Sequence, residues 1–179
     1  MVLVEGASDR LALERLARRL GRDLTAEGVE LVDMGGATNV GHHLDGLDST
    51  AGVLLAGLCD AREAPVVHRA LVRRGVADAE DGLEAAGFFV CVDDLEDELI
   101  RAVGVDRVLE VLDAEGDLRS YRIFEQQPAQ QDRPEHRRLR RFLGTRSGRK
   151  AHYAEVLVDA LDLAQIPEPL AAVLARVAP

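Results

Sequence analysis

Short apolar runs recur along the first hundred residues, and each is followed by a segment with helical periodicity. Polar and apolar side chains do not alternate within these runs, so both faces of each expected strand are buried. Buried strands separated by helices are typical of a parallel sheet that helices cover on both faces. We expect strands over residues 1–5, 29–34, 53–59 and 88–92. The pattern therefore predicts an α/β fold with a four-stranded parallel sheet.

Helices are expected between these strands and through the second half of the chain. In the first of them Leu13, Leu16 and Leu20 form an apolar face at helical spacing. Residues 126–133, which include Pro128, are expected to form a linker or mobile loop. The expected helices span residues 8–20, a weaker 38–47, 63–74, 95–103, 105–115, 135–143, 148–163 and 168–177.

We divide the chain into an α/β core, residues 1–104, and a helical extension, residues 105–179, that packs on the core as a single compact unit. The first apolar run is too short for a signal peptide and has no basic region before it. No stretch approaches the roughly 20 apolar residues of a membrane helix. Cys59 and Cys91 lie in apolar stretches and form no CxxC pair, which predicts reduced core thiols. These features favour a cytoplasmic protein.

Positive charge is concentrated in one segment. The formal net charge is −10, yet residues 133–150 carry eight Arg or Lys and the single acid Glu135. Phosphate binding depends more on local clusters of positive charge than on the total charge of a protein. The segment is therefore either a nucleic-acid-binding surface or a solvated charged helix. The candidate nucleic-acid contacts in it are Arg137, Arg138, Arg140, Arg141 and Arg149.

Carboxylates follow three of the four expected strands. Because parallel strands end at the same edge of a sheet, we expect these acids to converge there. Asp9, four residues after the first acid, can face the same place. Any one of these acids is also consistent with a helix cap or a turn, and it is their repetition that indicates a site. The acids after the strands are Glu5, Asp60, Asp93, Asp94 and Glu96.

Clustered carboxylates are unfavourable unless a cation neutralises them. Oxygen ligands without Cys or His suit Mg²⁺ or Mn²⁺ and argue against zinc. Such an ion retains water and substrate phosphate in its shell, and two ions about 3.5–4 Å apart support phosphoryl chemistry. The sequence therefore predicts one or two Mg²⁺ or Mn²⁺ ions.

Two further features fit phosphate chemistry but also allow simpler interpretations. Arg146 and Lys150 would stabilise charge that builds on a phosphate, or they are ordinary surface cations. The pair Gly35-Gly36 permits close backbone approach to a phosphate, or simply a tight turn. The chain contains neither GxxxxGK[ST] nor GxGxxG, so it has no recognised route to ATP binding.

Five segments in this order resemble the TOPRIM domain, and more narrowly that of the overcoming-lysogenization-defect (OLD) family nucleases. They read VLVEGASDRLALERLA, VDMGGATN, LAGLCDARE, FFVCVDDLEDEL and GTRSGRKAHYAEVLV. The resemblance runs from residue 1 to about residue 165. It implies a compact Rossmann-like parallel sheet and two-metal nicking or cleavage of DNA.

The resemblance also implies roles for individual residues. Glu5 and Asp9 match the first acidic motif, and Gly35 or Gly36 matches the glycine of the loop after the second strand. Asp60 matches the first acid of an Asp-x-Asp motif, Glu96 a later metal-binding acid, and Lys150 a basic residue near the C-terminus. We predict a metal site of Glu5, Asp9, Asp60, Glu63, Asp94 and Glu96, with Glu5, Arg146 and Lys150 as catalytic residues.

One position departs from the family pattern. The second Asp of the Asp-x-Asp motif is Arg62 here, followed by Glu63. An arginine would repel a second cation, so Glu63 substitutes as a ligand, or one metal binds tightly, or hydrolysis has been lost.

The predicted function is Mg²⁺-dependent hydrolysis of nucleic-acid phosphodiesters, with DNA as the expected substrate. OLD nucleases join an ATPase to the TOPRIM domain, so this chain is expected to act alone or with a separate ATPase subunit. The alternatives are a non-catalytic nucleic-acid-binding or scaffolding module, and a nucleotidyl or phosphoryl transferase.

Overall fold

The computed structural model describes residues 1–45, 52–146 and 148–179. Its strands form one sheet in the order β2-β1-β3-β4, and all neighbouring strands are parallel. The predicted α/β fold with a four-stranded parallel sheet is therefore confirmed. The strands are β1 (Val2–Val4), β2 (Leu31–Asp33), β3 (Ala56–Asp60) and β4 (Phe88–Cys91).

The helices lie close to their expected positions. The weak helix expected over residues 38–47 is a 3₁₀ turn, Ala37–Asn39, followed by a short α-helix. Residues 46 and 47 of that prediction lie outside the described residues. The helices are α1 (Ala7–Arg19), α2 (Val40–Asp45), α3 (Ala64–Arg73), α4 (Leu95–Val103), α5 (Val105–Ala114), α6 (Leu118–Glu125), α7 (Pro128–Gln131), α8 (Glu135–Leu143), α9 (Arg149–Ala160) and α10 (Glu168–Arg176).

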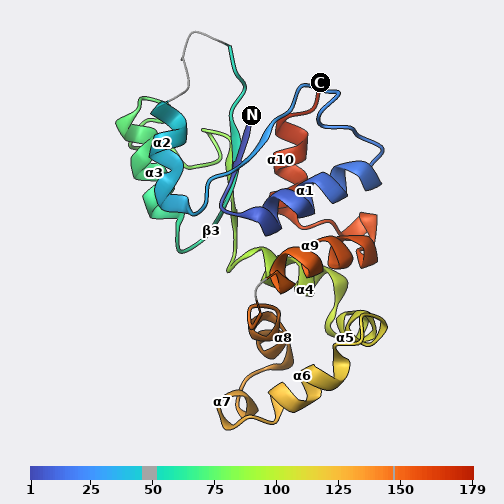
Figure 1. Cartoon of the computed structure of the whole chain (residues 1–179). Helices are drawn as coiled ribbons and strands as arrows, with labels where there is room; N and C mark the ends of the chain where they lie inside the picture. Colours follow the sequence, from blue (N-terminus) through green and yellow to red (C-terminus); the bar gives the residue numbers. More distant parts are fainter. Residues whose placement is uncertain (46–51, 147) are drawn as a thin grey trace.

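Helices cover both faces of the sheet (Figure 1). Helices α2 and α3 lie on one face, and α1 and α10 lie on the other. Within β1, the Leu3 side chain packs on the face covered by α2 and α3. Val2 and Val4 pack on the face covered by α1 and α10. All three side chains are fully buried. This two-sided burial is why the strands are apolar along their whole length.

The segment over residues 118–133 differs from its prediction. It contains α6, which the sequence analysis did not assign, and α7, where a linker or mobile loop was expected. Tyr121 of α6 is fully buried and meets the Phe142 ring edge-on, with the ring centroids 5.4 Å apart. Pro128 occupies the first turn of α7, where the missing N–H group breaks no helical hydrogen bond. The linker prediction is therefore wrong.

Hydrogen bonds hold α9 against α1, and this packing places the first turn of α9 near the end of β1. Arg15 of α1 donates two hydrogen bonds, of 2.6 and 2.7 Å, to the Asp159 carboxylate. Arg19 donates to the carbonyl groups of Val158 and Leu161 at the C-terminal end of α9, at 2.5 and 2.7 Å. The bond to Leu161 satisfies a carbonyl group at the end of the helix, whereas the Val158 carbonyl also accepts a 3.3 Å hydrogen bond from the Leu161 N–H group.

Cys59 and Cys91 are free and buried, as predicted. Burial raises the pKa of the Cys59 thiol to about 12, so this group is an unreactive thiol at neutral pH. None of the described helices combines the length and the apolar character that a membrane crossing requires.

Gly57 of β3 allows close packing against β4. The two strands place Gly57 opposite Phe88, and a Cβ atom at position 57 would overlap the fully buried Phe88 ring. We expect Gly57→Val to lower the free energy of unfolding by about 3 kcal/mol, because the core cannot take up the added volume. Urea denaturation measures this loss.

A smaller side chain in place of the Phe88 ring provides the control. Phe88→Leu in the Gly57→Ala background should recover part of the stability that Gly57→Ala loses, so the two losses should not add. An unchanged free energy of unfolding in Gly57→Ala alone would show that β3 and β4 accommodate the added Cβ atom without loss of stability.

Candidate active site

Five carboxylates meet where the direction of strand order reverses. Strand β1 lies between β2 and β3. The connection that follows β1 runs through α1 on one face of the sheet, whereas the connection that follows β3 runs through α3 on the other face (Figure 1). Such a switch point opens a crevice at the carboxyl ends of the strands. Here it holds a cavity of about 180 Å³, which we call the acidic cavity. Its charged lining residues are Glu5, Asp9, Asp60, Asp94, Glu96 and Lys150.

Glu5 and Asp60 lie at the ends of adjacent strands. The Asp60 backbone N–H donates a 2.8 Å hydrogen bond to Glu5 Oε1. The pKa of Asp60 is raised to about 8, chiefly by burial and also by the negative charges of Glu5 and Asp94. Burial likewise raises the pKa of Glu5, although the hydrogen bond from Asp60 opposes this. Both shifts indicate that negative charge is under-compensated here.

Asp9 lies in the first turn of α1 and is 8% exposed. Its Oδ2 accepts a 3.0 Å hydrogen bond from the Gly6 N–H group. The pKa of Asp9 is raised to about 7, chiefly by burial; the hydrogen bond from Gly6 opposes this, and the charges of Glu96 and Glu5 add to it. The fold therefore holds a third carboxylate beside Glu5, as the four-residue spacing predicts.

Glu96 and Lys150 form an ion pair at the edge of the acidic cavity. Lys150 Nζ lies 2.8 Å from Glu96 Oε2, and the Glu96 side chain is 6% exposed while that of Lys150 is 50% exposed. Burial by itself lowers the pKa of Lys150, but the hydrogen bond and the charge of Glu96 outweigh this effect and raise it. Lys150 is thus a protonated amine with one side open to solvent.

The donor set fits a hard divalent cation, although the side chains are not arranged as a ready ion cage. In residues 1–45, 52–146 and 148–179, no group of three or more His, Cys, Asp or Glu side chains is placed to hold a metal ion. Glu5, Asp9 and Glu96 each turn toward a local hydrogen-bond donor instead. Oxygen-only ligands with raised pKa values are nevertheless what Mg²⁺ or Mn²⁺ would stabilise.

Two of the predicted metal ligands, Asp94 and Glu63, have surroundings that differ from those of the other carboxylates. Asp94 caps α4 by accepting a 2.9 Å hydrogen bond from the Asp97 N–H group, and its other oxygen accepts one of 2.7 Å from Arg140. Both Asp94 oxygens are therefore engaged in holding the fold. Glu63 precedes α3 and stands outside the described lining of the acidic cavity, but its charge contributes to the raised pKa of Glu5.

The Gly35-Gly36 pair forms a tight turn whose backbone reaches the acidic cavity. The φ angles of Gly35 and Gly36 are 65° and 116°, a region that favours glycine. The Gly36 N–H group donates a 2.8 Å hydrogen bond to the Glu5 carbonyl oxygen, and Gly36 lines the acidic cavity. The turn therefore brings one of the two glycines to the site.

The basic segment is partly engaged in ion pairs with the acids that follow β4. Arg137 Nη1 lies 2.5 Å from Asp93 Oδ2, and Arg140 Nη2 lies 2.6 Å from Asp94 Oδ2. The sequence analysis treated these acids and these arginines as separate features. The only sequence signal for their pairing is that an acidic run, residues 93–98, and a basic run, residues 137–141, have opposite charge.

Arg149, which was predicted to contact nucleic acid, is buried in the structure. The Arg149 residue is 6% exposed, and its guanidinium lies 4.1 Å from the centroid of the Phe142 ring. It donates hydrogen bonds of 3.1 Å to Asp117, 2.7 Å to Thr145 and 3.2 Å to the Phe142 carbonyl. These contacts engage the guanidinium within the fold.

Arg146 and Arg138 also lie away from the acidic cavity. Arg146 lines a separate hollow with Phe124 and Phe142. The Arg138 side chain is half-buried, and its Nε has no hydrogen-bond partner within the described part of the chain. The structure therefore brings Lys150, but not Arg146, to Glu5.

A second hollow, of about 580 Å³, adjoins the acidic cavity, and we call it the arginine groove. Asp94 lines both hollows. Arg62 belongs to the lining of the arginine groove and is not among the residues that line the acidic cavity. The sequence analysis did not identify Arg62 or Arg133 as phosphate contacts. The arginines that line the groove are Arg62, Arg133, Arg137, Arg140 and Arg141.

The parallel sheet and its strand order match a Rossmann-like fold of the TOPRIM type. In sequence, residues 1–60 match the family described as "Overcoming lysogenization defect protein-like, TOPRIM domain". The predicted resemblance to the OLD-like TOPRIM domain is thereby confirmed. No curated protein sequence matches the chain.

Solved structures show the same fold over nearly the whole chain. The C-terminal region of the OLD protein of Xanthomonas campestris pv. campestris is 24% identical, with a TM-score of 0.68 over 98% of this chain and 92% of that one. The C-terminal region of the Burkholderia pseudomallei OLD protein is 18% identical, with a TM-score of 0.69 over 98% and 95% of the two chains. The helices that follow the sheet are thus part of the shared fold.

Proposed function

We propose that this protein is a divalent-metal-dependent nuclease that hydrolyses nucleic-acid phosphodiesters at the acidic cavity. The observation that carries the proposal is the convergence of Glu5, Asp9 and Asp60 beside Lys150 at the switch point of the sheet. The OLD-like TOPRIM match over residues 1–60 supports the same class of chemistry.

The residues divide into two chemical roles. Glu5, Asp9 and Asp60 would hold Mg²⁺ or Mn²⁺, with Glu96 joining them when it leaves Lys150. A bound ion would lower the pKa of its water and neutralise negative charge on the phosphate. Lys150, half-exposed at the cavity edge, would then be free to stabilise the charge that builds on the phosphate oxygens.

The three interpretations of the Arg62 position differ in their support. Arg62 lines the neighbouring groove, and Glu63 lies outside the acidic cavity among the described residues. Both placements favour one tightly bound ion over a second ion held by Glu63. The division at residue 104, a cytoplasmic location and a separate ATPase subunit stay predictions.

Nicking of supercoiled plasmid DNA tests the proposed activity. We expect the purified protein to relax the plasmid in Mg²⁺ or Mn²⁺ and to lose this activity completely in chelator, because the carboxylates require the cation. Gel electrophoresis of the plasmid forms measures the rate. Plasmid that stays supercoiled in every divalent metal would reject the nuclease.

A non-catalytic nucleic-acid-binding module is the second candidate function. It is favoured by the local hydrogen bonds of Glu5, Asp9 and Glu96, which occupy the acids without an ion. It predicts salt-sensitive DNA binding with no cleavage in the same plasmid assay.

A further inference from the structure

The arginine groove concentrates positive charge on a protein whose formal net charge is −10. Its lining has five arginines against two aspartates, Asp94 and Asp132. Like charges at this density repel one another unless an anion is shared between them. The composition of the groove therefore indicates an anionic ligand.

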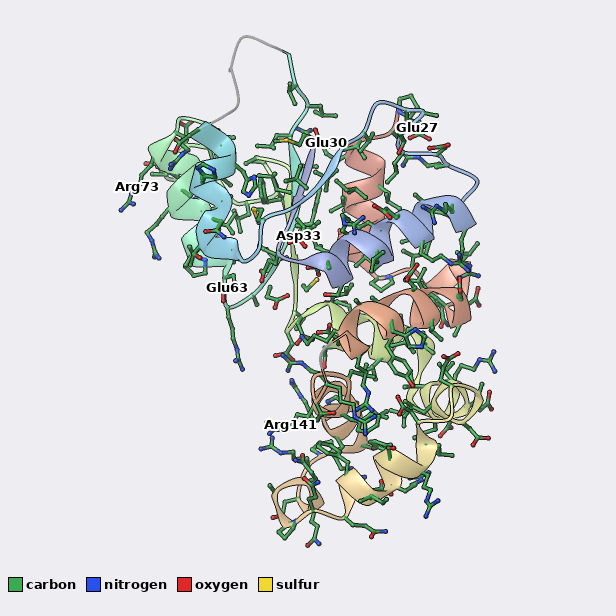
Figure 2. All side chains as sticks on the ribbon, viewed as in Figure 1. Glu27, Glu30, Asp33, Glu63, Arg73 and Arg141 are labelled. Atoms are coloured by element: carbon green, nitrogen blue, oxygen red, sulfur yellow. The ribbon has the colours of Figure 1, made fainter. Side chains whose placement is uncertain are left out.

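Three of the five arginines are available to such a ligand. Arg137 and Arg140 are paired with Asp93 and Asp94. By contrast, Arg62, Arg133 and Arg141 form no ion pair with any carboxylate in the described residues; Arg133 Nε donates a 3.0 Å hydrogen bond to the Ala129 carbonyl. Figure 2 shows Arg141 on the outer side of α8, where its side chain extends into solvent.

The available arginines come from separate segments. Arg62 lies in the turn between β3 and α3, Arg133 lies in the turn before α8, and Arg141 lies in α8 itself. A guanidinium presents a planar fork that binds phosphate through two parallel hydrogen bonds. Several forks spread along one hollow suit a ligand with several phosphates in a row.

The groove leads into the acidic cavity. Asp94 lines both hollows, and Arg140, which pairs with Asp94, lines the groove. Asp60 and Arg62 belong to one turn, in which the Glu63 N–H group donates a 3.0 Å hydrogen bond to the Asp60 carbonyl. This turn places Asp60 in the lining of the acidic cavity and, two residues later, Arg62 in the lining of the arginine groove.

We propose that Arg62, Arg133 and Arg141 bind successive phosphates of the nucleic-acid strand whose scissile phosphate enters the acidic cavity. This inference rests on the proposed function for its cleavage step but not for its binding step. At the position of Arg62, the Asp-x-Asp motif of the family that this chain resembles has its second aspartate. The proposed phosphate contact thus stands where the resemblance would place a metal ligand, next to Asp60.

The test measures DNA binding in chelator, so that binding is observed without hydrolysis. A fluorescently labelled single-stranded DNA is titrated with Arg62→Ala, Arg133→Ala and Arg141→Ala over a range of salt concentrations. Each variant should lower the slope of log affinity against log salt by about 0.7 and weaken binding roughly fivefold at about 0.1 M salt. Thermal unfolding of each variant confirms that these exposed substitutions leave the fold intact.

Arg107→Ala is the matched control, because it removes the same charge from an exposed residue of α5 that pairs with Glu110. Its affinity and salt slope should equal those of the wild type. Variants of Arg62 and Arg141 that bind DNA as tightly as Arg107→Ala would overturn the proposal.

Failure of the groove and failure of the nuclease give different results. If the wild type never nicks plasmid but Arg62→Ala still lowers the salt slope, the groove stands and the nuclease falls. If the wild type nicks plasmid and Arg62→Ala binds and nicks equally well, the nuclease stands and the groove falls.

Discussion

Replacing Asp60 by asparagine is expected to abolish nicking and, in the same protein, to increase the stability of the metal-free fold. Nicking should fall by at least about 100-fold, because the amide cannot supply the charge that the cation requires. The plasmid assay measures this loss. Asp113→Asn, a change at an exposed acid of α5, should leave the rate unchanged.

The increase in stability follows from the raised pKa of Asp60. The folded state raises this pKa from 3.8 to about 8, chiefly by burial, so folding disfavours the carboxylate form. An acid shifted upward lowers the stability of the fold progressively as the pH rises from about 4 to about 8. Because Asp60 is partly solvated and screened, we expect Asp60→Asn to gain about 1–2 kcal/mol at pH 8 and little at pH 4.

Urea denaturation in chelator at both pH values measures this difference. Added Mn²⁺ should then stabilise the wild type and have little effect on Asp60→Asn, because ligands that bind only the folded state shift its stability. A variant that is less stable than the wild type at pH 8 would show that Asp60 makes a structural contact instead.

Replacing Arg149 by methionine is expected to lower the free energy of unfolding by about 3 kcal/mol. The buried guanidinium supports Asp117, Thr145 and the Phe142 carbonyl, and its loss leaves these polar groups without their partner. Methionine preserves apolar volume beside Phe142, so the loss reports mainly on the polar contacts. Denaturant unfolding measures the change, and Arg146→Met at an exposed position should shift stability by less than about 0.5 kcal/mol.

Arg149 also separates a structural arginine from a phosphate-binding one. Where Arg149→Met is still folded, its salt slope for DNA binding should match the wild type, whereas that of Arg62→Ala should be lower. A reduced slope in Arg149→Met with full stability would support the prediction that Arg149 contacts nucleic acid.

The sequence by itself determined the sheet and the place of the acids. Apolar runs without alternation require burial on both faces, and parallel strands place the residues that follow them at one edge. Glu5 and Asp60 could therefore be assigned to one site before any coordinates. The helical positions of Leu13 and Leu16 likewise predicted α1 to within one residue at each end.

The sequence was less informative where local patterns are weak. Helices α6 and α7 lie in a segment with Pro128 and several glutamines, which resembles a loop when the chain is considered alone. Packing of Tyr121 against Phe142 stabilises α6 through a contact between residues from different helices. Tertiary packing thus overrode the local signal, as it often does for short helices.

Only the tertiary structure decided which charges pair and which stay open. Arg137, Arg140, Arg141 and Arg149 are equivalent in a basic run, yet two pair with Asp93 and Asp94, one is buried, and one lines the groove without an ion pair in the described residues. The identity of a charge is local information, but its partner comes from whichever element packing brings within hydrogen-bonding distance. Burial and pairing, and not charge itself, determine whether an arginine holds the fold or is available to a phosphate.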